Sequence, residues 1–198
     1  MFPDLTRDDV FRIETRRLWL RWPTAKDKDS ILKLAGDRSV AEMLARVPHP
    51  LPAPVVDTFV LQARAENAAG AGLTLALAKR SAPTSLIGVI SIHPGTDTVP
   101  ELGYWLGQPY WGAGLMREAV RALCDAFFAY AGGTDLASSA RTENPASRRV
   151  LEACGFAQIG TGTKPFPARG ADLPVDLFHL DRGRWQALAA EAALTEAA

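Results

Sequence analysis

The chain has 198 residues, with 22 basic and 22 acidic side chains, so its formal net charge is zero. Balanced charge disfavours a nucleic-acid partner, which usually requires a basic excess. No apolar run is long enough to be a membrane span or the core of a signal peptide. We therefore expect a cytoplasmic protein with no membrane partner, and the length suits one domain over residues 1–198.

Cysteine and histidine are scarce. The chain contains 2 cysteines and 3 histidines. Their spacing matches neither a redox motif nor a set of metal ligands, so we predict no metal site. Cys124 and Cys154 fall on apolar helix faces, where we expect them to be buried.

The N-terminal part of the chain predicts one strand followed by helices. The stretch RRLWLRW (16–22) alternates apolar and basic residues, as a strand does. Helical patterns follow, and a proline-rich loop at 48–54 interrupts them. The expected helices cover residues 25–37, 39–47 and 55–70.

The apolar period then changes to that of strands. We predict strands at 73–79, 86–92 and 99–106, with turns at 80–85 and 93–98 between them. Connections this short join antiparallel neighbours. The middle of the chain is therefore expected to form an antiparallel meander.

The stretch YWGAGLMREAV (110–120) places two glycines at the start of a helix expected over 114–130. The first amides of a helix have no acceptor inside the helix, and the helix dipole is positive there. Glycines would let an anion approach these amides closely. The turn is therefore either an anion site or simply a tight helix cap.

Two other phosphate-binding motifs fit this turn poorly. A Rossmann fingerprint requires a third glycine where Arg117 stands, and a parallel sheet before it. A P-loop requires Gly-Lys-Ser/Thr after four spacer residues, which is absent.

The C-terminal part alternates strand and helix. Strands are expected at 136–142 and 175–180, and an alanine-rich helical tail at 182–198. A helix over 144–156 has Asn144 as its N-cap and Pro145 in its first turn. The whole order predicts an α+β domain built around one sheet.

Three segments together resemble a known family. They are IETRRLWLRWPTAKD near the start, ELGYWLGQPYWGAGLMREAV, and NPASRRVLEACGF. In this order and spacing they resemble the GNAT superfamily of acyl-CoA N-acyltransferases, and within it the RimJ/RimL-like branch. The resemblance covers about residues 13–181. It implies a mixed, mostly antiparallel sheet with a splayed central edge, flanked by helices.

The resemblance also implies where acetyl-CoA, the co-substrate, would bind. Its pyrophosphate would lie on the amides of the glycine turn, and its pantetheine arm along the open strand edge. Asn144 would also bind the arm. The implied cofactor-binding residues are Tyr104, Trp105, Leu106, Trp111, Gly112, Ala113, Gly114, Leu115, Met116 and Asn144.

The implied chemistry is direct attack of an amine on the thioester, without a protein nucleophile. Glu101 would take the proton from the amine, and Ser147 or Tyr104 would protonate the leaving thiolate. A strand amide would stabilise the developing oxyanion. Arg148 and Arg149 are further candidates, for the 3′-phosphate of the cofactor.

The function implied is N-acetyl transfer to a primary amine, either a protein N-terminus or a small molecule. We expect the acceptor in a groove formed by the early helices, the 48–54 loop and a loop at 161–174, with Phe166 and Arg169 shaping it. A non-catalytic acyl-CoA-binding module is the alternative. The identity of the acceptor, the length of the acyl group and assembly as a homodimer stay open.

Overall fold

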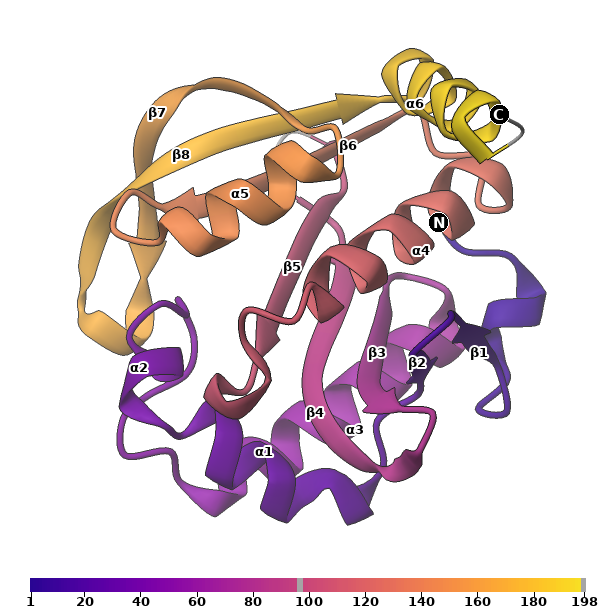
Figure 1. Cartoon of the computed structure of the whole chain (residues 1–198). Coiled ribbons are helices and arrows are strands. Elements are labelled where there is room, and N and C mark those ends of the chain that lie inside the picture. The colour runs from indigo at the N-terminus through magenta and orange to yellow at the C-terminus, as the bar shows by residue number, and fades with distance from the viewer. Residues whose placement is uncertain (96–97, 197–198) are drawn as a thin grey trace.

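The computed structural model describes residues 1–95 and 98–196, and its strands form one eight-stranded sheet (Figure 1). The strand order is β1-β2-β3-β4-β5-β6-β8-β7. Only β5 and β6 run parallel, and all other neighbours are antiparallel. The strands are β1 (Arg12–Glu14), β2 (Leu18–Arg21), β3 (Leu73–Lys79), β4 (Ala82–His93), β5 (Glu101–Leu106), β6 (Asp135–Arg141), β7 (Ala157–Phe166) and β8 (Ala171–Asp181).

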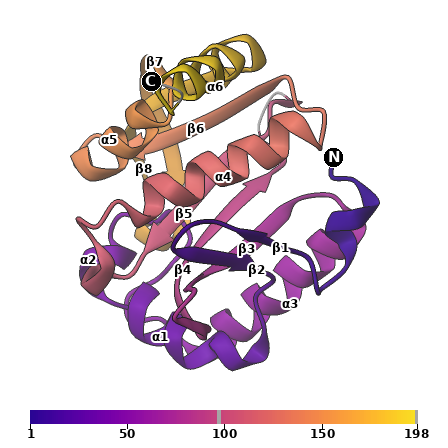
Figure 2. The same cartoon turned by 45° about the vertical axis from the view of Figure 1, so that its right-hand side comes forward.

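Helices cover both faces of this sheet, as Figure 2 shows. The helices are α1 (Lys28–Ala35), α2 (Arg38–Ala41), α3 (Ala53–Ala69), α4 (Leu115–Ala129), α5 (Pro145–Ala153) and α6 (Arg182–Glu196). Strand β3 contributes side chains to the apolar cores on both faces of the sheet. Leu75 and Leu77 pack toward the α4 side, whereas Ala76 between them packs against α1 and α3. The predicted α+β class is confirmed.

The centre of the sheet is splayed. Strands β5 and β6 pair at only two positions, Glu101 with Ala137 and Leu102 with Ser138. Beyond Ser138, β6 continues beside β8 alone, while β5 stays beside β4 as far as Leu106. The two strands therefore separate toward the C-terminal end of β5, as the resemblance implied.

Several expected boundaries were wrong. The expected loop at 161–174 is largely the β7–β8 hairpin, closed by a 3-10 turn at Pro167–Arg169. Strand β1 was missed, and the second helix ends at Ala41 instead of residue 47. Strand β4 begins at Ala82, inside the expected turn at 80–85. Residues 96–97 of the expected turn at 93–98 lie outside the described residues, as do 197–198 of the tail.

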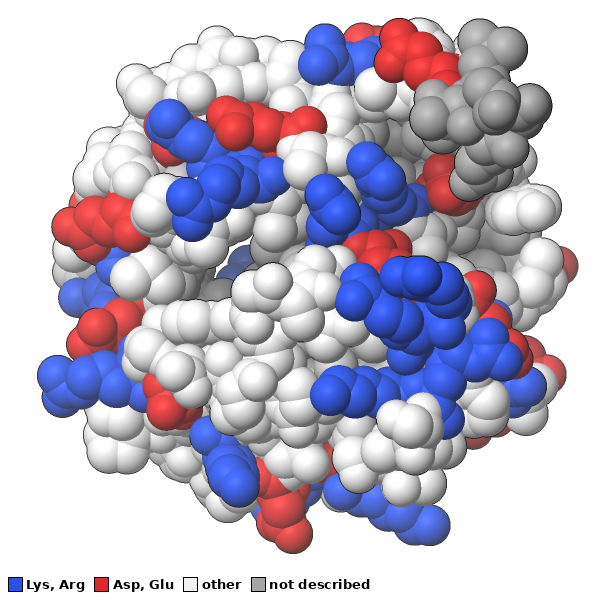
Figure 3. Space-filling model, in the orientation of Figure 1, with Lys and Arg blue, Asp and Glu red and all other residues white. Residues whose placement is uncertain are grey.

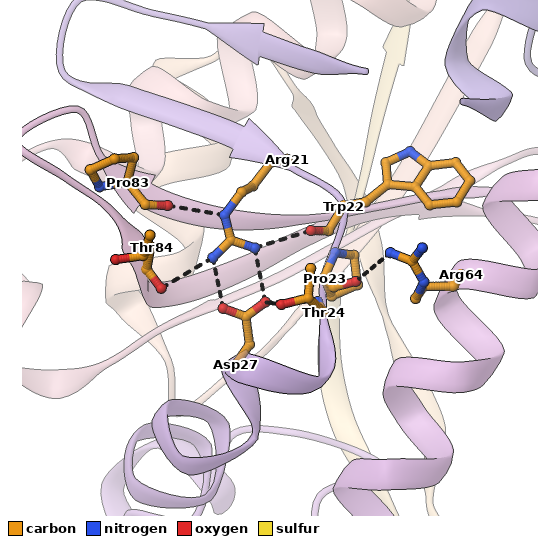
Figure 4. Close-up of polar contacts among 8 residues, drawn as sticks. All are labelled: Arg21, Trp22, Pro23, Thr24, Asp27, Arg64, Pro83 and Thr84. Carbon is orange, nitrogen blue, oxygen red and sulfur yellow. Dashed lines mark hydrogen bonds and ion pairs between the residues drawn. The ribbon is translucent and has the colours of Figure 1, made fainter. Parts of the chain in front are cut away.

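A buried ion pair joins the end of β2 to the start of α1 (Figure 4). Arg21 Nη1 and Nη2 bind the two carboxylate oxygens of Asp27 at 2.9 and 2.7 Å. Arg21 Nε also donates to Pro83 O at 3.0 Å, at the start of β4. Asp27 is 1% exposed and also accepts from Thr24 N. One guanidinium thus fixes three segments that support the sheet.

Candidate functional site

A cavity of about 1410 Å³ lies where β5 and β6 separate. In Figure 3 the surface is hollowed there, between α5 and the start of α4. Its walls are β5, the glycine turn, the end of β6, α5 and the segment 39–45. All twelve predicted site residues line it: Glu101, Tyr104, Trp105, Leu106, Trp111, Gly112, Ala113, Gly114, Leu115, Met116, Asn144 and Ser147.

Strand β5 turns an open backbone edge toward this cavity. Gly107 N donates to Ile87 O on the β4 side, at 2.9 Å. Leu102 O accepts from Ser138 Oγ on the β6 side, at 2.9 Å. Because backbone groups alternate sides along a strand, Tyr104 and Leu106 face the same side as Leu102. Trp111 Nε1 already donates to Leu106 O, at 2.6 Å. In the described chain no strand pairs with β5 there, so the backbone N–H groups of Tyr104 and Leu106 can bind an extended ligand.

The glycine turn has the backbone of an anion site. Gly112 and Gly114 have φ of 75° and 70°, in the left-handed region that favours glycine. A Cβ built on Gly112 would have no atom within 4 Å, so the space in front of the turn is open. Gly114 precedes α4, and no side chain caps it. The first amides of α4 are therefore available to a ligand.

The side chains that follow the turn do not obstruct it. Leu115 and Met116 are both 5% exposed and belong to the apolar core beneath α4. Their amides can face a ligand while their side chains pack inward. The larger side chain of Met116 is thereby accommodated.

A polar brace that the sequence did not predict supports the turn from behind. Arg17 Nη1 donates to Ala113 O at 2.8 Å, and Arg17 Nε binds Glu118 Oε2 at 2.6 Å. Glu118 Oε1 also accepts from Thr15 Oγ1 and Arg17 N. Burial raises the pKa of Glu118, but the hydrogen bonds from Thr15 and Arg17 outweigh burial and the pKa is lowered.

The start of α5 brings three polar side chains together. Asn144 Oδ1 accepts from Ser147 N at 3.1 Å, which confirms Asn144 as the N-cap. Tyr104 Oη lies 2.9 Å from Ser147 Oγ and donates to Ser147 O at 3.2 Å. Burial raises the pKa of the Tyr104 phenol, so it stays protonated near neutral pH. Ser147 and Tyr104 thus form a hydrogen-bonded pair of hydroxyls at the cavity wall.

Glu101 is held by two partners. Its Oε1 accepts from Ser139 Oγ at 3.2 Å and forms an ion pair with Lys164 Nζ. Lys164 belongs to β7, and its side chain is 28% exposed, against 20% for Glu101. Lys164 was not predicted as a partner, because the segment 161–174 was expected to be a loop.

The secondary candidates fare differently. Arg148 binds the buried Asp176 at 2.6 Å, so its expected role toward a 3′-phosphate loses support, whereas Arg149 lines the cavity. Phe166 also lines the cavity. Arg169 instead donates to Ala41 O and Val47 O, which fastens the segment after α2.

The cysteines and potential metal ligands offer no second site. Cys124 and Cys154 are free and buried, and burial raises the pKa of both thiols, to about 11 for Cys154. His179 pairs with Asp135 at 3.0 Å. Within residues 1–95 and 98–196, no cluster of three or more His, Cys, Asp or Glu side chains suits a metal ion. None of the helices in these ranges is both long and apolar enough to cross a membrane.

Comparison with known proteins identifies the family. The profile of the acetyltransferase (GNAT) domain matches residues 17–157, which include all twelve predicted site residues. The chain belongs to the GNAT acetyltransferase family. The match begins at the arginine that braces the glycine turn and continues past α5.

Individual relatives support this assignment. The chain is 30% identical over 105 residues to the "Putative ribosomal N-acetyltransferase YdaF" of Bacillus subtilis (strain 168), and this match covers 52% of the chain and 57% of the relative. The ribosomal-protein-S5-alanine acetyltransferase of Vibrio fischeri has a similar fold, with a TM-score of 0.75 at 20% identity, over 88% of this chain and 98% of that one. The acetyltransferase MccE, solved with acetyl-CoA and AMP, gives 0.71 at 18% identity over 84% and 93%. The name of the Bacillus subtilis relative agrees with the RimJ/RimL-like branch, and the two solved structures share the fold.

Proposed function

We propose that this chain is an N-acetyltransferase that transfers an acetyl group from acetyl-CoA to a primary amine by direct attack in a ternary complex. The observation that carries the proposal is the cavity itself, in which an open strand edge meets a helix start rich in free amides. Those two features suit two adjoining parts of acetyl-CoA, its extended amide-bearing arm and its diphosphate. The MccE structure with acetyl-CoA supports the same co-substrate.

Acetyl-CoA supplies the activated acetyl thioester. The amides following Gly112 and Gly114 would hold its diphosphate, because an open, positively polarised helix start favours anions. The β5 edge at Tyr104 and Leu106 would hold its arm through backbone hydrogen bonds. A β5 amide would also stabilise negative charge that develops on the carbonyl oxygen.

Two residues of the chain would each transfer one proton. Glu101 would accept the proton that the attacking amine releases as its nitrogen bonds to the acetyl carbon. Ser147, hydrogen-bonded to Tyr104, would donate a proton to the sulfur as the carbon–sulfur bond breaks. A lysine amine costs about 4.6 kcal/mol to deprotonate at pH 7, whereas an α-amine costs about 1.1 kcal/mol. A single carboxylate base therefore suits an α-amine better.

The ribosomal names of the relatives make a protein N-terminus one acceptor class to test. A cytoplasmic setting forms part of the proposal, because an enzyme acting on nascent or ribosomal proteins would work there. The test is release of free thiol from acetyl-CoA across a panel of peptides and small amines. The buried cysteines do not interfere, because their raised pKa values keep them unreactive toward the thiol reagent.

A shape-matched pair of variants that differ in charge tests the diphosphate site. Gly112→Asp places a carboxylate where the proposal places the diphosphate, whereas Gly112→Asn has nearly the same shape without the charge. Both residues tolerate a left-handed backbone better than other side chains. Repulsion between the charges should weaken CoA binding by about tenfold more in the Asp variant. Equal affinity in the two variants, measured by calorimetry, would place the diphosphate elsewhere.

The alternative of a binding module is separated by a second measurement. Glu101→Gln should slow transfer sharply while CoA affinity stays nearly unchanged, because the carboxylate acts on the acceptor amine. If CoA binds but no amine in the panel yields thiol, the chain is a non-catalytic acyl-CoA-binding protein.

A further inference from the structure

The half of the cavity opposite the glycine turn is walled by the segment 39–45, the end of β6 and the β7–β8 hairpin; we call it the acceptor half. Three carboxylates line it, those of Glu42, Glu101 and Glu143. Unpaired, they would give this half a strong negative charge and attract polycations. Their partners decide whether that charge is available.

Each of the three carboxylates has a cationic partner. Glu101 pairs with Lys164. Glu143 pairs with Arg141, whose side chain is only 12% exposed. Glu42 pairs with Arg38 at 3.6 Å, a looser and more exposed contact. Within the described chain, three negative and three positive charges therefore balance around the acceptor half.

The pair at Glu101 is the one built into the cavity wall. Gly162, Lys164 and Phe166 alternate toward the less exposed side of β7, and Phe166 lines the cavity. Lys164 is fixed by the ladder, opposite Leu173 of β8. The Lys164 ammonium and the Ser139 hydroxyl both donate to Oε1 of Glu101. Oε2 is therefore left for the acceptor amine.

From this arrangement we infer that Lys164 is a specificity-determining residue that makes the site select acceptors with one amine over diamines and polyamines. The inference rests on the proposed function. A single amine can be served by Oε2 of Glu101. A second ammonium would enter a half whose carboxylates are already neutralised, and it would lose hydration without gaining a partner.

Two small amines of equal chain length provide the test, butylamine and diaminobutane. Their ratio of kcat/KM is measured by thiol release for the wild type, Lys164→Met and Lys164→Arg. The wild type should favour butylamine. Lys164→Met should raise the relative use of diaminobutane about fivefold, mainly through a lower KM. A fivefold change corresponds to the loss of one exposed charge interaction. Lys164→Arg keeps the charge and should keep the wild-type ratio.

The outcomes separate this inference from the function on which it rests. No thiol release with any amine in the panel overturns the proposed function. Transfer with an unchanged ratio in Lys164→Met, or a wild type that favours diaminobutane, overturns only the role of Lys164. If neither small amine is acetylated, the ratio is read from their inhibition of the best acceptor, and no inhibition by either also overturns it. Lys164→Gln replaces the Met variant if that variant fails to fold.

Discussion

Replacing Glu118 with Gln tests the brace behind the glycine turn. The carboxylate accepts from Thr15 Oγ1 at 2.6 Å, Arg17 N at 2.8 Å and Arg17 Nε at 2.6 Å. A neutral amide has one acceptor oxygen, and its NH₂ group would face a donor. At least one charge-assisted hydrogen bond is then lost, which costs about 1.5–3 kcal/mol. The side chain is 17% exposed, so solvent offsets part of this, and we expect about 1.5 kcal/mol.

The same change should reach the ligand site. Arg17 carries the hydrogen bond to Ala113 O, and without Glu118 its guanidinium is no longer fixed. The turn would then sample other conformations, and CoA affinity should fall roughly threefold to tenfold. Urea unfolding measures the first effect and calorimetry with CoA the second. Glu14→Gln is the matched control, since its pairs with Arg12 and Arg80 are both exposed and should together be worth under about 0.5 kcal/mol.

The pH dependence follows from the sign of the Glu118 shift. The pKa of Glu118 is lowered in the folded protein from its ordinary value of 4.5. The carboxylate therefore stabilises the fold fully at pH values above that ordinary value. That stabilisation disappears as pH falls through the folded pKa. The difference in unfolding free energy between the wild type and Glu118→Gln should therefore shrink in acid. If the difference in unfolding free energy stayed constant from pH 7 into acid, or if the variant were as stable as the wild type at pH 7, the stabilising role of Glu118 would be refuted.

Two further predictions concern single side chains. Asp27→Asn breaks a buried bidentate pair and should cost about 3–5 kcal/mol in urea unfolding. Asp57→Asn, in the exposed pair with Lys28, should cost under about 0.5 kcal/mol. Similar losses in the two variants would contradict the idea that burial makes the Arg21–Asp27 pair important. Asn144→Asp keeps a good N-cap, so stability should change by less than about 0.5 kcal/mol, while Asn144→Ala should lose about 1 kcal/mol. If the Asn144 amide binds the cofactor arm, both variants should weaken CoA binding, and unchanged affinity in the Asp variant would restrict Asn144 to capping.

Local patterns predicted the parts of the fold that depend on neighbouring residues. The apolar stripe from Leu115 to Phe127 indicated a helix at 114–130, and α4 spans Leu115–Ala129. Asn144 followed by Pro145 marked the start of α5 correctly. These signals are strong because capping and amphipathic spacing act within a few residues.

The missed elements depend on distant partners. Strand β7 contains Gly160, Gly162 and Pro165, which weaken any strand pattern, and it is held by pairing with β8. Lys164 meets Glu101 only because that hairpin returns over the cavity. Arg17 and Glu118 likewise meet across the sheet edge and the start of α4. Contacts between residues so far apart in the sequence cannot be predicted from the spacing of apolar residues within one element.

The open edge of β5 connects the fold to the proposed chemistry. A strand edge inside a domain leaves backbone groups that require hydrogen-bond partners, which water or a ligand must supply. Tyr104 lies on that edge, and its hydroxyl reaches across the gap to Ser147 at the start of α5. This contact keeps α5 and β5 at a fixed separation, so the gap is a built feature and not a failure of pairing. A fold that holds an edge open in this way can bind an extended amide chain with little rearrangement, and the proposed proton donor, Ser147, lies beside that edge.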